Sequence, residues 1–190
     1  GQMFTRGVHL GVAANDKGKI EVHPAEARVR LDEARRLASV QDINKNWEGV
    51  LILLEKVPET AFNDRERADR LRLLAKAEAG RGRFPQAVAN LEKLLFDRSI
   101  GDGVDHFWYA NLLQDWKGRS KSRKAFDVVA GDAENKEVQA IAHMRMAEIV
   151  NEKGNWKKAQ EFYESAAKLV PATTWALASE EISQQLGMGK

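Results

Sequence analysis

The side chains that could carry out acid-base or metal chemistry do not gather into a site in this sequence. The four histidines are never three or four residues apart, the step at which two helical histidines share a metal ion; they are His9, His23, His106 and His143. His143 falls at a packing position of a helical pattern, so we expect it to be structural. The chain has no cysteine, which excludes thiolate ligands, a cysteine nucleophile and disulfides.

Glycines and carboxylates also lack the context that catalysis needs. The segments 80–82 and 101–103 each have two glycines, but neither follows a strand or has the lysine and hydroxyl of a phosphate-binding loop. Several carboxylates stand beside lysines at helical spacing, as on a solvated face with ion pairs: Glu148, Glu152, Glu161 and Glu164. The sequence therefore predicts no catalytic residue, cofactor or metal, and we expect a protein that is not an enzyme.

Aromatic and basic residues suggest binding instead. Phe107, Trp108 and Tyr109 could stack on a ligand, although burial between helices is the expected role of Tyr109. Residues 117–124 have five cations and no carboxylate: Lys117, Arg119, Lys121, Arg123 and Lys124. A second basic stretch, 65–83, is diluted by Asp69 and Glu78. RNA binding would need such charge to line a groove with aromatics, so we prefer a solvated turn.

Bulk composition sets the general class of the protein. Of 190 residues, 43% are apolar and 31% charged, which suits an ordinary globular domain, and the net charge of +2 gives little reason to expect a polyanionic partner. Apolar runs such as 50–54 are far shorter than the roughly 20 residues of a membrane span. Residues 1–10 do not resemble a secretory signal, which favours a cytoplasmic location; a periplasmic protein whose leader or anchor had been removed would look the same.

Hydrophobic periodicity predicts helices from Pro24 onward. The predicted helices span 25–40, 46–57, 64–80, 84–97, 105–117, 120–130, 135–153, 155–169 and 173–186. Before them, Val8, Leu10 and Val12 alternate with smaller or polar residues, Asn15–Gly18 has turn chemistry, and Ile20 and Val22 alternate again. We therefore expect residues 1–23 to be an extended segment with a β-hairpin.

A repeated pattern organises the helical region. The segment 142–171 has a large-then-small pair at Met146 and Ala147, a turn with Gly154 and Trp156, and a second helix marked by Ala159, Tyr163, Ala166 and Pro171. This segment resembles a complete tetratricopeptide repeat. The small position of the second helix recurs earlier at Val50, Ala87 and Ala125, at intervals of 37, 38 and then 34 residues. The third repeat departs most from the pattern. Leu113 replaces a small residue, Ser122 replaces the aromatic residue of the turn, and Asp132 replaces a small apolar residue.

The resemblance implies a fold for most of the chain. It predicts an all-α, right-handed superhelix, or solenoid, of about four helix pairs over 24–190. The helix at 173–186 is expected to cap the stack, with Trp175, Leu177 and Ile182 on one face.

The resemblance also implies a concave groove lined by the first helix of each pair. The side chains expected to face it are Arg35, Ser39, Arg72, Lys76, Phe107, Ala110, Gln114, Met144, Glu148 and Asn151. Arg72 and Lys76 could together accept a carboxylate of a bound peptide. Some family members grip a chaperone's terminal carboxylate with asparagines, but Ser39 and Lys76 stand where these would be needed.

We therefore predict a non-catalytic scaffold that binds a protein or peptide partner in its groove, within a larger assembly. Two alternatives remain: an RNA-binding helical-repeat protein that uses residues 117–124, and one domain of a membrane-anchored assembly factor, suggested by the hairpin. Self-association through an exposed repeat end or the hairpin edge is a further expectation. No direct membrane insertion is expected.

Overall fold

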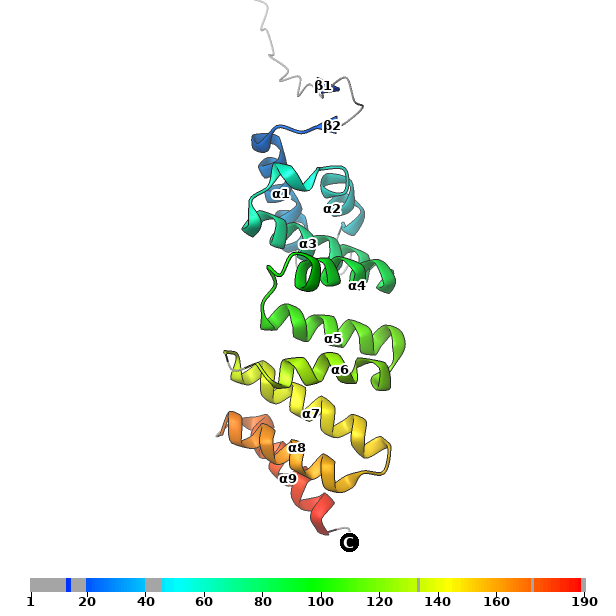
Figure 1. Ribbon diagram of the computed structural model, residues 1–190, viewed down its shortest axis with the longest axis vertical. Coiled ribbons are helices and arrows are strands. Elements are labelled where there is room, and N and C mark those ends of the chain that lie inside the picture. Colours follow the sequence, from blue (N-terminus) through cyan, green and yellow to red (C-terminus); the bar gives the residue numbers. More distant parts are fainter. Residues whose placement is uncertain (1–12, 15–19, 40–45, 133, 172, 189–190) are drawn as a thin grey trace, which may run out of the picture. The chain divides into compact units, whose positions relative to one another are not determined.

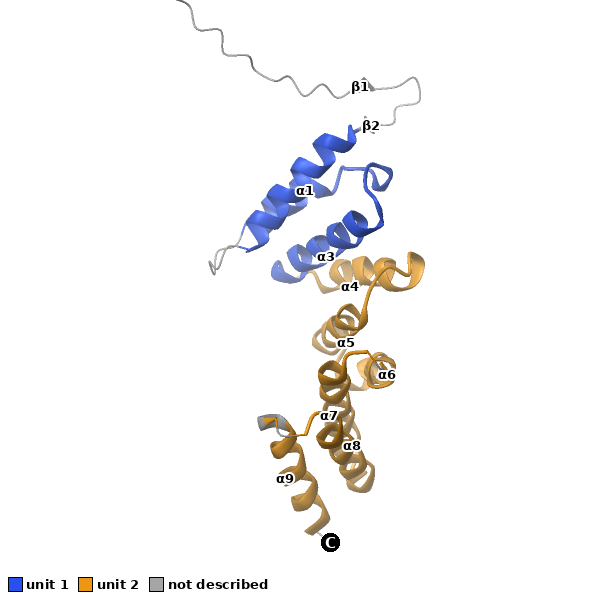
Figure 2. Ribbon diagram, turned by 90° about the vertical axis from the view of Figure 1, so that its left-hand side faces the viewer, with its two compact units in different colours: residues 1–81 blue, residues 82–190 orange. Residues whose placement is uncertain are grey.

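The computed structural model describes residues 13–14, 20–39, 46–132, 134–171 and 173–188. Contacts divide the chain into two compact units, unit 1 (residues 1–81) and unit 2 (residues 82–190) (Figure 2). Apart from one pair of very short strands, the regular structure of the described residues is helical. The all-α prediction is therefore confirmed.

Unit 1 begins with two strands, β1 (Ala13–Ala14) and β2 (Ile20–Glu21). They pair antiparallel, with Ala13 opposite Glu21 and Ala14 opposite Ile20. The predicted alternation at Val8, Leu10 and Val12 and the predicted turn at 15–18 lie outside the described residues.

Three α-helices form the body of unit 1: α1 (Pro24–Ser39), α2 (Trp47–Leu54) and α3 (Asp64–Gly80), with a short 3₁₀-helix at Glu59–Ala61 before α3. Each α-helix packs on its neighbour in sequence, and α1 also contacts α3. Their apolar faces meet in one cluster that includes Leu31, Val50, Leu54 and Leu74. The predicted second helix ran to residue 57, but α2 ends at Leu54.

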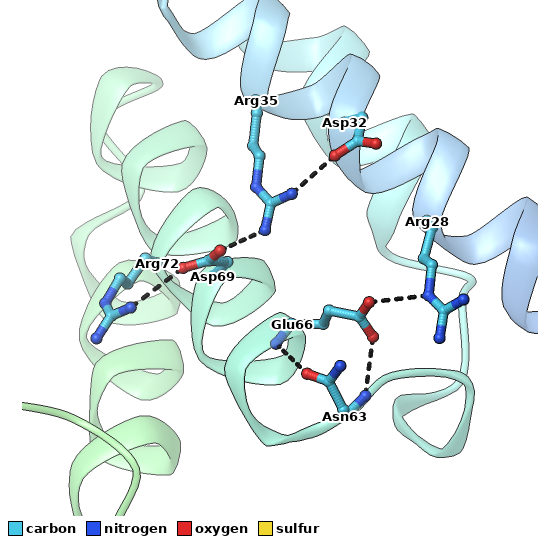
Figure 3. Close-up of polar contacts among 7 residues, drawn as sticks. All are labelled: Arg28, Asp32, Arg35, Asn63, Glu66, Asp69 and Arg72. Carbon is cyan, nitrogen blue, oxygen red and sulfur yellow. Dashed lines mark hydrogen bonds and ion pairs between the residues drawn. The ribbon is translucent and has the colours of Figure 1, made fainter.

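Local capping residues position α2 and α3. The side chain of Asn46 accepts from the backbone N–H of Gly49 at 2.8 Å, which satisfies a donor that the first turn of α2 leaves open. Asn63 and Glu66 form a reciprocal pair at the start of α3, each side chain accepting from the other's backbone N–H at 2.9 Å (Figure 3). The first turn of α3 is thereby fixed.

Unit 2 contains six α-helices among its described residues: α4 (Phe84–Glu92), α5 (Gly103–Lys117), α6 (Arg119–Ala130), α7 (Lys136–Glu152), α8 (Trp156–Leu169) and α9 (Thr174–Met188). A π-helical turn, Lys93–Asp97, continues α4. From α4 to α9 each helix packs on the next, and α5 also contacts α7 (Figure 1). These helices agree with the predicted ones to within two residues, apart from the π-helical turn.

Large and small side chains alternate in the core of unit 2. Phe126, Met146 and Ile149 fill the space between α5, α6 and α7. Ala147 and Ala159 are fully buried beside Tyr163 and let α7 and α8 approach closely. The expected packing face of the last helix is wrong, because Leu177 is 61% exposed while the smaller Ala176, Ser179 and Ser183 are buried. These small residues allow α9 to pack closely against α8.

Candidate functional site

The clearest candidate site in unit 1 is a cleft of about 270 Å³ between α1 and α3. We call it the α1–α3 cleft; it is lined by Arg35, Ala38, Ser39, Asp69, Arg72, Leu73 and Lys76. The structure thus brings together four of the residues predicted to face a groove, Arg35, Ser39, Arg72 and Lys76.

Helical spacing explains why these side chains share one cleft. The lining residues of α1 are three and four positions apart, and those of α3 follow the steps of three, four and seven that keep residues on one helix face. Two ion pairs join the helices, Arg28 with Glu66 and Arg35 with Asp69. The pairing advances along both helices together, so α1 and α3 run in the same direction.

Asp69 organises the charges of the cleft. Its carboxylate pairs with Arg35 across the cleft, and its other oxygen accepts from Nη1 of Arg72 at 3.2 Å (Figure 3). Arg35 also donates to Asp32 at 2.7 Å. The α1–α3 cleft is lined by three cations and one carboxylate, so it keeps a surplus of positive charge.

The cleft combines this charge with a small apolar surface. Ala38 and Leu73 line it between the charged groups, and Leu73 is buried. The hydroxyl of Ser39 donates to the carbonyl oxygen of Arg36 at 2.8 Å, which fixes the end of α1. Arginine donates in a planar fork that matches a carboxylate, whereas lysine acts as a point charge. A carboxylate next to a short apolar side chain would suit this lining.

The ion pair Arg28–Glu66 stabilises one side of this arrangement. Nε of Arg28 lies 3.0 Å from Oε1 of Glu66. The backbone N–H of Asn63, together with the Arg28 guanidinium, lowers the pKa of the Glu66 carboxyl. Glu66 therefore stays ionised at neutral pH while it caps α3 and holds α1.

The predicted groove residues of unit 2 lie on α5 and α7 in different settings. Phe107 and Met144 pack against buried clusters, and the ring of Phe107 lies 6.3 Å from that of Phe126. Glu148 pairs with Arg145 at 3.1 Å, and Asn151 is exposed. Oε1 of Gln114 is buried, with no hydrogen-bond partner among the described residues.

Ala110 was expected to face the groove, and that expectation is wrong. It is fully buried in the cluster between α5, α6 and α7. The reason is that α5 is contacted by α4, α6 and α7, so more than one of its faces is covered.

The aromatic run at 107–109 does not form a stacking platform. Consecutive helical residues point in different directions, and Phe107 packs inward on Phe126. Tyr109 instead packs edge-on against Phe96, with ring centroids 5.5 Å apart, and its hydroxyl donates to Glu92 at 3.1 Å. Burial, with the nearby Glu92 carboxylate, raises the pKa of Tyr109 to about 12.

Sequence reasoning missed the roles of two charged residues on α3. The sequence alone indicates Asp69 only as a diluent of basic charge and gives no separate role to Arg70. The spacing of Asp69 to Arg72, a helical step of three, was a usable signal for their pairing. The pairing of Asp69 with Arg35 joins residues 34 positions apart and carries no local signal.

Comparison with known proteins assigns no family: no family model, curated protein or solved structure matches this chain. Among the residues that the structure describes, no helix is both long and apolar enough to span a membrane. The same residues include no group of three or more histidine, aspartate or glutamate side chains placed to hold a metal ion.

Proposed function

We propose that this chain is a non-catalytic helical-repeat scaffold of the tetratricopeptide kind that binds an acidic segment of a partner polypeptide in the α1–α3 cleft. The observation that carries the proposal is the lining of that cleft, which contains three cations, Arg35, Arg72 and Lys76, and one carboxylate, Asp69. An incoming aspartate or glutamate would meet the surplus charge, and Ala38 and Leu73 would contact its apolar neighbours.

Two features support the finer architecture, a right-handed superhelix of stacked helix pairs. First helices of successive pairs contact each other in both units, α1 with α3 and α5 with α7. Ion pairs between neighbouring pairs of helices also join residues about one repeat apart: Arg35 with Asp69 over 34 positions and Arg119 with Glu152 over 33. A crystal structure in which the helix pairs do not stack with a constant rotation would contradict this architecture.

Peptide binding tests the proposed function directly. A fluorescein-labelled peptide of alternating glutamate and leucine should bind the intact chain in an anisotropy titration, and its glutamine counterpart should bind much more weakly. Arg72→Gln/Lys76→Gln should reduce affinity for the acidic peptide about tenfold or more, because both cations that α3 contributes to the cleft lining are removed.

A matched control separates the cleft from general charge attraction. Lys56→Gln/Arg65→Gln removes two cations from the same unit, and both side chains are exposed and do not line the cleft. This variant should keep affinity within about twofold, since distant exposed charges are screened by salt. Equal losses in the two double variants, or equal binding of the acidic and glutamine peptides, would refute the cleft as the binding site.

A further inference from the structure

The turn between α5 and α6 and the turn between α7 and α8 lie side by side in unit 2, on the right-hand side of Figure 1. Two contacts join them: Arg119 pairs with Glu152, and Nζ of Lys153 donates to the hydroxyl oxygen of Ser120 at 3.2 Å. A second basic segment is thereby placed beside the basic residues at 117–124. We call residues 115–124 and 152–158 together the basic edge.

Positive charge is concentrated on the basic edge. Its two segments contain eight lysines and arginines and two carboxylates, whereas the whole chain has a net charge of only +2. One of those carboxylates, Glu152, is already paired with Arg119. All eight cations are exposed. Arg119 and Lys158 form ion pairs, and among the described residues the other six form none: Lys117, Lys121, Arg123, Lys124, Lys153 and Lys157. The remainder of the molecule is therefore net negative, and a polyanion would be attracted to this edge.

Two tryptophans belong to the same edge. Trp116 is 38% exposed, and Nζ of Lys117 lies 4.1 Å from the centroid of its ring. Trp156 begins α8, and Nζ of Lys157 lies 5.5 Å from its ring centroid. An aromatic face next to lysines is the combination that single-stranded nucleic acid uses, because the base stacks on the ring while cations contact the phosphates. Acidic polypeptides would use the charge but have no need of the ring.

From this juxtaposition we infer that the basic edge binds single-stranded nucleic acid. The lysines and arginines contact phosphates, and Trp116 stacks on a base. Contacts of this kind do not distinguish one base sequence from another, so binding should depend strongly on salt and weakly on sequence. This site lies wholly in unit 2 and is independent of the α1–α3 cleft.

Anisotropy titration of fluorescein-labelled oligouridylate of about 16 nucleotides tests the inference on the intact chain. If about four phosphates are contacted, the logarithm of the association constant should fall with the logarithm of salt concentration at a slope of about −3. Lys121→Glu/Arg123→Glu should lower affinity at low salt by about tenfold or more and flatten that slope by about 1.4.

The control variant is Lys136→Glu/Lys168→Glu. It makes the same change of charge in the same unit, at exposed positions in the first turn of α7 and the last turn of α8. These are the helix ends away from the basic edge, which contains the last residue of α7 and the first turn of α8. Both double variants are compared at about 0.1 M salt, where the Debye length is about 10 Å. The control should then keep affinity within about threefold, because both of its positions lie more than two helical turns from the basic edge. A loss as large as that of Lys121→Glu/Arg123→Glu would overturn the assignment.

Variants of Trp116 distinguish binding of nucleic acid from binding of other polyanions. Trp116→Ala should weaken oligouridylate binding by about fivefold or more, and Trp116→Phe, which keeps a stacking ring, should retain most of the affinity. Circular dichroism of both variants verifies that the helices are intact. Absence of oligouridylate binding at low salt, unchanged affinity in Trp116→Ala, or equal competition by poly-glutamate would each overturn the inference.

Discussion

The guanidinium of Arg70 on α3 donates to the carbonyl oxygen of Leu54, the last residue of α2, from Nε at 3.2 Å and from Nη2 at 3.0 Å. Arg70 is only 7% exposed, and a buried cation needs such acceptors. Burial lowers the pKa of Arg70, and the carboxylates of Glu59 and Glu55 oppose that shift. The last carbonyls of a helix lack partners within it, so Arg70 satisfies the end of α2 from a neighbouring helix.

Replacing Arg70 should therefore destabilise unit 1. In Arg70→Met, the carbonyl oxygen of Leu54 keeps only one donor, the backbone N–H of Val57 at 3.3 Å, and we expect a loss of roughly 1–2 kcal/mol of unfolding free energy. Arg70→Lys should be intermediate, because lysine keeps the charge but lacks the planar fork. Urea unfolding followed by circular dichroism measures both. Arg65→Met, at an exposed site on the same helix, should stay within about 0.5 kcal/mol of the wild type; a similar loss there would contradict a specific role of Arg70.

The end of α2 shows where sequence reasoning reaches its limit. Apolar periodicity continues past Leu54 to Val57, so the sequence alone predicted a longer helix. The carbonyl of Leu54 accepts from the backbone N–H of Val57 and from the side chain of Arg70, which lies 16 positions further along, and no local pattern reveals the contact with Arg70. The start of α3 at Asp64 agrees with the predicted residue, and its cap joins two residues only three positions apart, Asn63 and Glu66.

The candidate site was predictable only where local sequence spacing places its residues. Arg35, Arg72 and Lys76 were found from repeat spacing, which fixes the helix face on which a residue lies. The pairing of Asp69 with Arg35 depends on how α1 packs on α3, and the burial of Ala110 depends on a third helix covering α5. Both are consequences of packing between segments far apart in the sequence.

Gly80 at the end of α3 should be sensitive to substitution. A Cβ atom at this position would lie 2.1 Å from Nε1 of Trp47 and 2.5 Å from Cε2, so the indole or the helix end would have to move. Overpacking of this kind costs about 1–3 kcal/mol, and the better helix propensity of alanine offsets at most about 1 kcal/mol. Gly80→Ala should therefore lower the unfolding free energy by about 1–2 kcal/mol in urea denaturation.

Gly131→Ala is the matched control for that substitution. Gly131 follows α6 with φ of −88°, and the nearest atoms to a Cβ there are carbonyl oxygens at 3.6 and 3.9 Å. Alanine fits without strain and restricts the unfolded chain, so stability should be unchanged or rise by up to about 1 kcal/mol. If Gly80→Ala is as stable as Gly131→Ala, Trp47 does not pack on Gly80 as described.

His143 should make the stability of unit 2 depend on pH. It is half-buried on α7, its ring lies 5.9 Å from that of Phe162, and its Nδ1 has no hydrogen-bond partner among the described residues. Burial lowers the pKa of His143, and the carboxylate of Asp127 only partly opposes this. A lowered folded-state pKa means that the unfolded chain takes up the proton more readily, so stability is lost as pH falls below about 6.5.

The His143→Gln variant isolates this contribution. Its side chain is neutral at every pH, so the fall in urea midpoint between about pH 7.5 and about pH 5 should be smaller than in the wild type. The carboxylates contribute equally to both proteins and cancel in the comparison. An identical or larger fall in the variant would show that His143 is not the group responsible.

Asp69 should limit the affinity of the α1–α3 cleft for acidic ligands. Its carboxylate already occupies donors of Arg35 and Arg72, so an incoming glutamate must share or displace them. Asp69→Asn keeps the shape of the side chain but removes its charge, leaving three cations in the lining without a carboxylate. We expect the glutamate–leucine peptide to bind about two- to fivefold more tightly, in keeping with the 0.5–1 kcal/mol of a solvent-accessible ion pair, while unfolding free energy falls by about 1 kcal/mol or less.

Asp32→Asn is the control, because Asp32 also pairs with Arg35 but does not line the cleft. If Asp69→Asn binds the peptide less tightly than the wild type, the main effect of Asp69 is to hold the two arginines in place for the ligand, and its competition with the ligand for their donors is the smaller effect. The ligand would then enter the cleft around an intact Arg35–Asp69–Arg72 bridge.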